Sequence, residues 1–257
     1  MLHIKPISAF HDNYIWMISH PESSRVIIVD PGEAKGVLEI LKERHYSLAG
    51  ILITHHHHDH TAGIKALIKE YPAPVYGPAR DAVPLCDQPL TESDEVAFPD
   101  LKLSLQVLDI PGHTAGHIAF VGEGLLFSGD TLFTAGCGRL FEGTAGQMVH
   151  SLAKLAQLPN ETLVYCGHEY TANNLRFAAL VEPENTAIQE RIHEVDLKRA
   201  QGLPTVPASL AIEKQTNPFL RCHVPAVIRA AEEHCRKSLE GDLTAVFSVI
   251  REWKNQY

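Results

Sequence analysis

The most distinctive segment of the chain is a run of histidines with one aspartate, Thr-His-His-His-His-Asp-His, at residues 54–60. In an extended segment, side chains two positions apart project the same way, so His55 and His57 can reach one metal ion. Asp59 and His60 follow where the chain turns toward the next helix, and they can reach a second ion nearby. Imidazole and carboxylate ligands without cysteine suit Zn²⁺, and also iron or manganese. The run therefore predicts a site for two divalent metal ions.

Three more candidate ligands follow strand-like apolar runs elsewhere in the chain, and they are His113, Asp130 and His168. The apolar run at 51–53 precedes the histidine segment in the same way. Loops at the ends of several strands can converge on one edge of a scaffold, where sites are usually built. We therefore expect these three side chains to complete the cluster, although each one alone would be read as a cap or turn residue.

Two other interpretations of the histidine run are weaker. A solvent-exposed histidine tract would not directly follow a buried apolar strand, and a structural zinc site is usually closed and rich in cysteine. The alternation that brings two histidines inward also predicts that His56 and His58 point away from the metals. Asp30, at the end of its own strand, is a candidate partner for a ligand histidine.

The elements that must position these residues alternate between strand and helix up to about residue 170, which indicates an α/β class. Strands are expected at 26–29, 50–53, 103–110, 117–121, 125–127 and 162–165. Helices are expected at 34–45 and 62–71, and then at 172–181, 184–200, 224–239 and 243–253. We therefore predict a mixed α/β domain with the metal site over residues 1–170 and a mostly helical domain over residues 171–257.

Composition is that of an ordinary globular protein of 257 residues, with 45% hydrophobic residues and a net charge of −9. An acidic chain has no general attraction for nucleic acid or for an anionic membrane surface, so we expect neither as a partner. The five cysteines form no CxxC pair, which argues against a thiolate zinc site or a disulfide framework. Because the N-terminus has no signal-peptide pattern, we expect a cytoplasmic protein. We also expect a monomer.

At this point the sequence resembles the metallo-β-lactamase superfamily, through the motif HxHxDH at residues 55–60, and within it the glyoxalase II family, the hydroxyacylglutathione hydrolases. The resemblance covers nearly the whole chain. The segments that carry it are His11-Asp12-Asn13-Tyr14, Pro111-Gly112-His113-Thr114, Gly129-Asp130-Thr131-Leu132-Phe133, Ala135-Gly136-Cys137-Gly138-Arg139, Cys166-Gly167-His168-Glu169-Tyr170-Thr171 and Asn217-Pro218-Phe219. HxHxDH alone specifies the superfamily, and the other segments narrow it to the family.

The resemblance implies an αββα sandwich with two metal ions, most simply Zn²⁺, at one edge. It assigns His55, His57 and His113 to one metal. It assigns Asp59, His60 and His168 to the other, with Asp130 bridging the two, so that Asp59 and Asp130 are the catalytic carboxylates. It further implies a thioesterase of methylglyoxal degradation, which cleaves S-(2-hydroxyacyl)glutathione, typically S-D-lactoylglutathione, to glutathione and D-lactate.

The family's glutathione-binding positions correspond to Arg139, Phe141, Tyr170, Arg251 and Lys254. Arg251 and Lys254 are three positions apart on the expected last helix, so they share a face and could hold a carboxylate together. Without the resemblance, that face would be read as an ordinary solvated one. Phe141 departs from family members that have tyrosine there, which removes one hydrogen bond to glutathione.

Two adjacent metal ions would favour hydrolysis by a metal-activated water molecule. A bridging water would lose its proton near neutral pH and attack the thioester carbonyl, while one metal stabilises the oxyanion. The rivals are a β-lactamase, which should have a signal peptide, and a nuclease, which should have a basic face. Two more are an iron-dependent dioxygenase for glutathione persulfide, with a mononuclear site and a shorter C-terminal part, and a metal-binding protein without catalysis.

Overall fold

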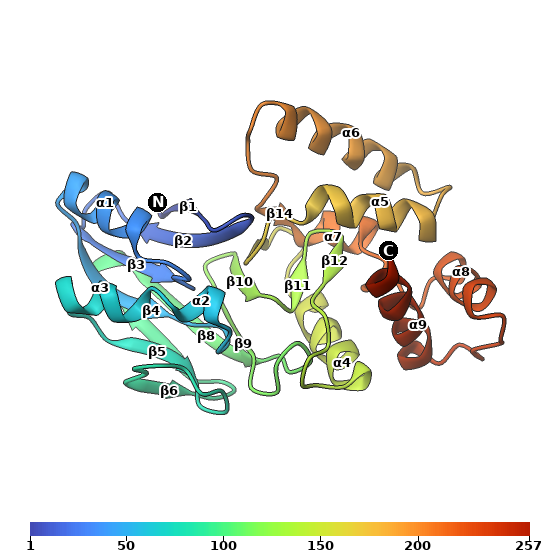
Figure 1. The fold of residues 1–257 in the computed structure, drawn as a ribbon, viewed down its shortest axis with the longest axis horizontal. Coiled ribbons are helices and arrows are strands. Elements are labelled where there is room, and N and C mark those ends of the chain that lie inside the picture. The colour runs from blue at the N-terminus through green and yellow to red at the C-terminus, as the bar shows by residue number, and fades with distance from the viewer. The chain divides into compact units, whose positions relative to one another are not determined.

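The computed structural model describes residues 1–257, which divide into two compact units (Figure 1). The first unit comprises residues 1–109 and 114–129, and the second comprises residues 110–113 and 130–257. None of the helices is both long and apolar enough to cross a lipid bilayer.

The first unit contains a six-stranded sheet whose strands are neighbours in chain order. They are β1 (His3–Ala9), β2 (Asn13–Ser19), β3 (Arg25–Val29), β4 (Ser47–Leu52), β5 (Val75–Pro78) and β6 (Gln88–Leu90). The first three pair antiparallel, and β3 to β6 pair parallel. Because parallel neighbours need a crossover, helices α1 (Lys35–Arg44) and α3 (Ile64–Glu70) connect them and lie along one face of the sheet (Figure 1). They bury Leu41 and Leu67 in one core with Ile28 and Ile51.

The rest of the first unit is an antiparallel meander and a short helix. The meander strands are β7 (Glu95–Phe98), β8 (Leu103–Asp109), β9 (Ile118–Gly122) and β10 (Leu125–Gly129), with a 3-10 turn at Pro99–Leu101 after β7. Phe120 and Phe127 are fully buried. The short helix α2 (His58–Thr61) begins inside the histidine run.

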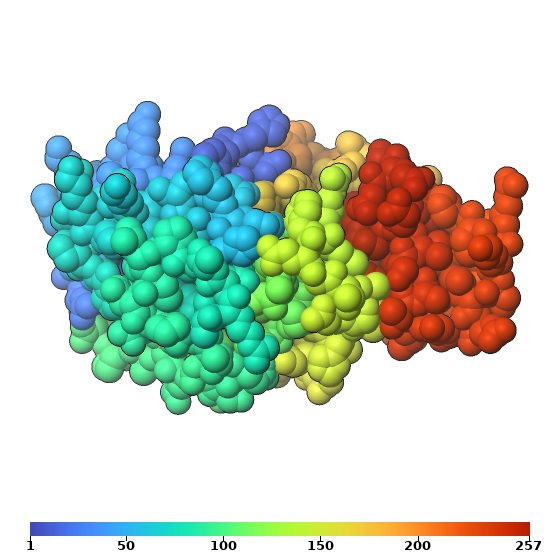
Figure 2. All heavy atoms as spheres, turned by 60° about the horizontal axis from the view of Figure 1, so that its bottom comes forward, coloured from blue at the N-terminus to red at the C-terminus, as the bar shows by residue number.

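The second unit is mostly helical. Its helices are α4 (Ala145–Ala156), α5 (Thr171–Val181), α6 (Thr186–Ala200), α7 (Leu210–Thr216), α8 (Pro225–Cys235) and α9 (Leu243–Gln256). Its strands form two antiparallel pairs, β11 (Leu132–Phe133) with β12 (Gly136–Cys137), and β13 (Leu163–Cys166) with β14 (Ala208–Ser209). The atoms of α8 and α9 lie side by side at the red end of the colour range in Figure 2.

Most of the predicted elements are confirmed, with shifts at their ends. The helix predicted over 224–239 ends early, at Cys235, because Arg236 takes a left-handed backbone conformation with φ 57°. Several elements were not predicted, namely the strands β1, β2, β5, β6, β7, β11, β12 and β14 and the helices α2, α4 and α7. The division of the chain into domains near residue 170 stays a prediction.

One buried ionisable group in the second unit makes folding depend on pH. Burial raises the pKa of Glu213 on α7 to about 7, although hydrogen bonds from Ala135 and Asn217 and the charge of Arg191 act in the opposite direction. In the unfolded chain, Glu213 loses its proton at a lower pH than in the folded chain. The stability that the protonated group contributes is therefore complete at low pH and is lost as pH rises toward 7 and just above.

We therefore expect Glu213→Gln, which cannot ionise, to gain stability relative to the wild type as pH rises from 5 to 8. The gain should be on the order of 1–3 kcal/mol. Chemical denaturation of both proteins at several pH values measures the difference. A difference that does not change between pH 5 and pH 8 would contradict a raised pKa at this position.

Candidate metal centre

In the first unit, a single carboxylate orients two of the predicted ligand histidines. Asp30 follows β3, and its Oδ2 lies 3.1 Å from Nδ1 of His60 and accepts a hydrogen bond from Oγ1 of Thr54 at 2.7 Å. Since the Thr54 hydroxyl donates to Asp30, its oxygen can accept from Nδ1 of His55, 3.1 Å away. Both imidazoles then carry their proton on Nδ1 and present the Nε2 lone pair as a ligand. The expected pairing of Asp30 with a ligand histidine is thus confirmed.

The other predicted ligands of the first unit lie beside this pair. Nε2 of His55 faces Nδ1 of His57 at 3.1 Å. The Asp59 carboxylate lies 3.7 Å from Nε2 of His60 and accepts a hydrogen bond from Nδ2 of Asn13 at 2.9 Å. These nitrogens and oxygens therefore gather in one small volume, as the spacing of the histidine run predicts.

In the second unit, one carboxylate faces two histidines. Asp130 Oδ2 lies 3.6 Å from Nε2 of His113 and 3.3 Å from Nε2 of His168. Nδ1 of His113 lies 2.8 Å from the carbonyl oxygen of Arg139, which can only accept. His113 therefore also carries its proton on Nδ1 and directs the Nε2 lone pair toward Asp130. All three residues are at most 6% exposed.

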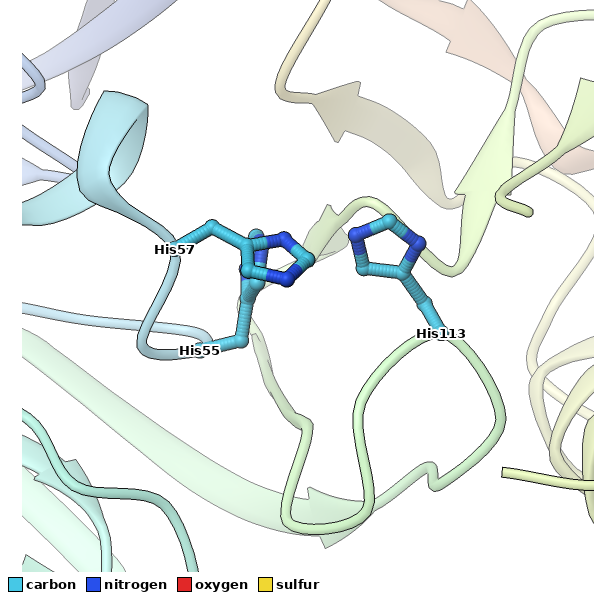
Figure 3. Close-up of side chains that lie close together, drawn as sticks. All are labelled: His55, His57 and His113. Atoms are coloured by element: carbon cyan, nitrogen blue, oxygen red, sulfur yellow. The ribbon is translucent and has the colours of Figure 1, made fainter. Parts of the chain in front are cut away.

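Ligand atoms of the seven predicted residues occur in groups of three whose members lie within 4.8 Å of one another. These groups are His55 with His57 and His113 (Figure 3), Asp59 with His60 and His168, and His55 with His60 and Asp130. His58 is exposed, as expected for a side chain outside the cluster. His56 is closer than expected, because its ring lies 5.0 Å from that of His57.

The donor set fits divalent metal ions. Several imidazole nitrogens and carboxylate oxygens, most of them on buried residues, direct their lone pairs toward one another. Without a cation, such a gathering of acceptors would cost electrostatic energy. The groups contain no cysteine, which favours a site with open coordination positions over a closed structural one.

The five residues that the resemblance assigns to substrate binding all lie in the second unit. The ring of Tyr170 stacks on that of His168 with centroids 4.6 Å apart, and Phe141, which is 64% exposed, meets the ring of His113 edge-on. Arg251 is only 4% exposed and donates from Nη1 to the carbonyl oxygen of Cys137 at 2.7 Å. The interpretation of this helix face as solvated is therefore wrong for Arg251.

Lys254 lies close to two other cations. Its Nζ is buried without a hydrogen-bond acceptor and lies 5.0 Å from the centre of the Phe177 ring. Burial, and then the charges of Arg251 and Arg139, lower the pKa of Lys254 to about 8. Three cationic groups held together in this way form a local basic group on an acidic protein, and they attract an anion.

The structure adds three residues near the ligands that the sequence reasoning missed. Asn13 holds Asp59. His117 stacks on His55 with ring centroids 4.5 Å apart. Asp81 accepts hydrogen bonds from the Thr114 hydroxyl and from the backbone of His56. Asn13 belongs to one of the segments that carry the family resemblance, so the sequence contained a signal for it. The sequence around Asp81 contains no pattern that sets it apart from other surface aspartates.

Comparison with known proteins covers the whole chain. Residues 11–168 match the family model described as metallo-beta-lactamase superfamily. Residues 169–257 match the one described as hydroxyacylglutathione hydrolase C-terminus. A curated protein of Nitrosomonas eutropha named hydroxyacylglutathione hydrolase is 51% identical over 257 residues, which is 100% of both chains.

Solved structures share the fold. ETHE1 from Myxococcus xanthus matches with a TM-score of 0.66 and 27% identity, over 85% of this chain and 84% of that one. TTHA1623, solved in a di-iron-bound form, matches with a TM-score of 0.59 and 25% identity, over 85% of this chain and 100% of that one. The predicted metallo-β-lactamase type of sandwich with a helical C-terminal part is confirmed, and the His/Asp cluster is a site for divalent metal ions.

We predict that Asp30→Asn weakens Zn²⁺ binding by about 10- to 100-fold, the usual cost of losing the partner of a ligand histidine. Asparagine tolerates the left-handed backbone at this position, φ 51°, but it has one acceptor oxygen. Asp30 uses two, Oδ1 for the Thr54 backbone amide and Oδ2 for the Thr54 hydroxyl and His60. Zn²⁺ affinity is measured by competition with a chelator. The matched control is Asp87→Asn, because Asp87 accepts only from the backbone of Val75. Equal affinities in the two variants would show that Asp30 does not orient the ligands.

Proposed function

Because the chain belongs to the hydroxyacylglutathione hydrolase family of the metallo-β-lactamase superfamily, we propose that it hydrolyses S-(2-hydroxyacyl)glutathione thioesters, with S-D-lactoylglutathione as the typical substrate. The products are glutathione and a 2-hydroxy acid, D-lactate for that substrate. The observation that carries the proposal is that a hydrolytic type of metal centre and a buried basic group occur in the same chain.

We assign His55, His57 and His113 to one metal ion, Asp59, His60 and His168 to a second, and Asp130 to both, with Zn²⁺ as the ion. The groups of ligand atoms within 4.8 Å of one another support this assignment. When bound, the two ions would polarise the thioester carbonyl and lower the pKa of a water molecule at the site. Asp59 and Asp130 are the carboxylates at the reaction centre.

The protein's own groups then orient and bind. Asp30 and Thr54 keep the Nδ1 protons of His55 and His60 in place, so that the ligand atoms need no rearrangement during the reaction. Lys254, together with Arg251 and Arg139, is suited to a carboxylate of glutathione, because its Nζ is buried without an acceptor of its own. Tyr170 and Phe141 lie beside ligand histidines, where they can contact the glutathione chain.

Hydrolysis forms one carbon–oxygen bond and breaks one carbon–sulfur bond. The oxygen of water bonds to the carbonyl carbon and its two protons pass to solvent. The carbon–sulfur bond breaks, and the sulfur leaves as a thiolate that takes up one proton, so that the products at neutral pH are a carboxylate, a thiol and one released proton. A free thiol has a pKa of about 8.5, so the thiolate departs without a strong general acid. That the enzyme acts as a monomer in the cytoplasm stays a prediction from the sequence.

The test is turnover by the Zn²⁺-loaded full chain of three substrates, S-D-lactoylglutathione, a β-lactam and a phosphodiester. We expect hydrolysis of the thioester, followed by loss of its absorbance, with at least a hundredfold lower kcat/KM for the other two. Hydrolysis of either rival substrate without hydrolysis of the thioester would overturn the proposal.

The lowered pKa of Lys254, about 8, gives a second prediction. Above pH 8 Lys254 loses its charge and attracts a carboxylate less, so KM for S-D-lactoylglutathione should rise severalfold between pH 7 and pH 9. Lys254→Met should have a high KM at both pH values, with kcat changed less. The exposed Lys237 supplies the control. If Lys254→Met keeps the KM of Lys237→Met, Lys254 does not bind substrate.

A further inference from the structure

A small hairpin links two of the residues that the proposed function uses. β11 and β12 pair Leu132 with Cys137 and Phe133 with Gly136, around a turn of two residues. Asp130 lies two positions before β11 and Arg139 two positions after β12. At the base of the hairpin, the Gly138 amide donates to the Thr131 carbonyl at 3.2 Å. The conformation of this hairpin therefore determines where both residues lie.

The base of the hairpin is packed too closely to move independently of Asp130. A Cβ added to Gly138 would lie 2.0 Å from the carbonyl oxygen of Asp130 and 2.9 Å from Nδ1 of His113. Phe133 contacts the rings of Tyr170 and His168 edge-on, at 5.2 and 5.9 Å between centroids. A displaced hairpin would thus disturb several of the proposed ligands and contacts together.

Polar side chains of the helical part hold the turn of this hairpin. Asn174 of α5 donates from Nδ2 to the carbonyl oxygen of Thr134 at 2.9 Å. Glu213 of α7 accepts from the amide of Ala135 at 2.8 Å. Asn217, directly after α7, donates from Nδ2 to the carbonyl oxygens of Phe133 at 3.1 Å and Gly136 at 2.9 Å, and contacts Oε2 of Glu213 at 3.1 Å. We call these three side chains the hairpin clamp.

The clamp is buried, and its geometry is specific. Asn174 is 3% exposed, and Glu213 and Asn217 are 0% exposed. A Cβ on Gly136 would lie 2.5 Å from Nδ2 of Asn174, so only glycine allows this approach. Ala135 takes a left-handed φ of 54° and places its methyl group in the core formed with α5 and α6.

Burying a carboxylate and two amides costs solvation energy that apolar side chains would not cost. Oε1 of Glu213 has no hydrogen-bond partner, but the four bonds of the clamp to the backbone of residues 133–136 each depend on direction, whereas apolar packing tolerates small shifts. The clamp therefore pairs backbone groups of the turn and holds the turn in one position.

We propose that the hairpin clamp, Asn174 with Glu213 and Asn217, positions Asp130 and Arg139 for metal binding and thioester hydrolysis. These are positioning residues, because their side chains bond to the backbone of the hairpin and not to the proposed ligand atoms. The part of the proposal that concerns hydrolysis rests on the proposed function, and the part that concerns the metals does not.

The test uses the full chain with the substitutions Asn174→Ala, Glu213→Ala and Glu213→Gln. The control is Thr216→Val, which removes a buried hydroxyl that bonds within the same helix, to the carbonyl oxygen of Ile212. For each variant, kcat and KM for S-D-lactoylglutathione are measured, and Zn²⁺ affinity is measured by chelator competition. All measurements are made below the melting temperature of the least stable variant.

We expect the two alanine variants to lower kcat and Zn²⁺ affinity and to raise KM, with affinity falling about tenfold, at the low end of effects seen for groups that orient ligands. Glu213→Gln keeps an acceptor for the Ala135 amide, so it should recover most of each loss. Thr216→Val should match the wild type in all three quantities.

The proposal is overturned if the alanine variants lose only thermal stability while kcat, KM and Zn²⁺ affinity stay within twofold of Thr216→Val. Should Glu213→Ala fail to fold, Asn174→Ala decides, because it removes one hydrogen bond and leaves the pair of Glu213 and Asn217 in place. A wild type that hydrolyses no glutathione thioester would refute the proposed function, and the Zn²⁺ affinities would still test the clamp.

Discussion

An imidazole can bind a metal through one nitrogen only when the proton on its ring is held by the other nitrogen. In the first unit this requirement is met by Asp30, which orients His60 directly and His55 through the Thr54 hydroxyl. Asp30 can do so because β3 and β4 are parallel neighbours, and its own amide donates to Leu52 at the end of β4. The pairing of two strands thus determines which ring nitrogen is protonated in two of the proposed ligands.

The second unit meets the same requirement with a backbone group. The carbonyl oxygen of Arg139 faces Nδ1 of His113, so the segment that carries a proposed substrate-binding residue also orients a proposed metal ligand. This links metal binding and substrate binding through one short piece of chain. Any change in the β11–β12 hairpin would therefore affect both.

The helices at the C-terminal end serve this segment in two ways. Arg251 donates to the carbonyl oxygen of Cys137 in β12, while Glu213 and Asn217 hold the turn. Lys254, one turn further along α9, has its ammonium group buried beside the Phe177 ring, and this burial, together with the charge of Arg251, lowers its pKa. An acidic protein obtains a basic group in this way, by bringing a few cations together rather than by a change in overall charge.

Much of this could be predicted from the sequence, because it depends on local pattern. His55 and His57 follow a buried strand at a spacing that brings them together, and helices and strands with strong periodicity were located to within a few residues. The helix α4 and the strands β1 and β2 were missed. The burial of Arg251 was also missed, because an arginine on a terminal helix gives no local sign of what packs against it.

The sequence by itself determined the types of ligand, their order along the chain and the α/β class, since these follow from residue chemistry and from periods of two and 3.6 residues. Only the tertiary structure decided which ring nitrogen of each histidine carries the proton, which cations are buried and which side chains hold the hairpin. Those properties come from contacts between residues far apart in the chain, 24 positions for Asp30 with Thr54 and 84 for Phe133 with Asn217. Such contacts exist only after the strands have paired and the helices have packed.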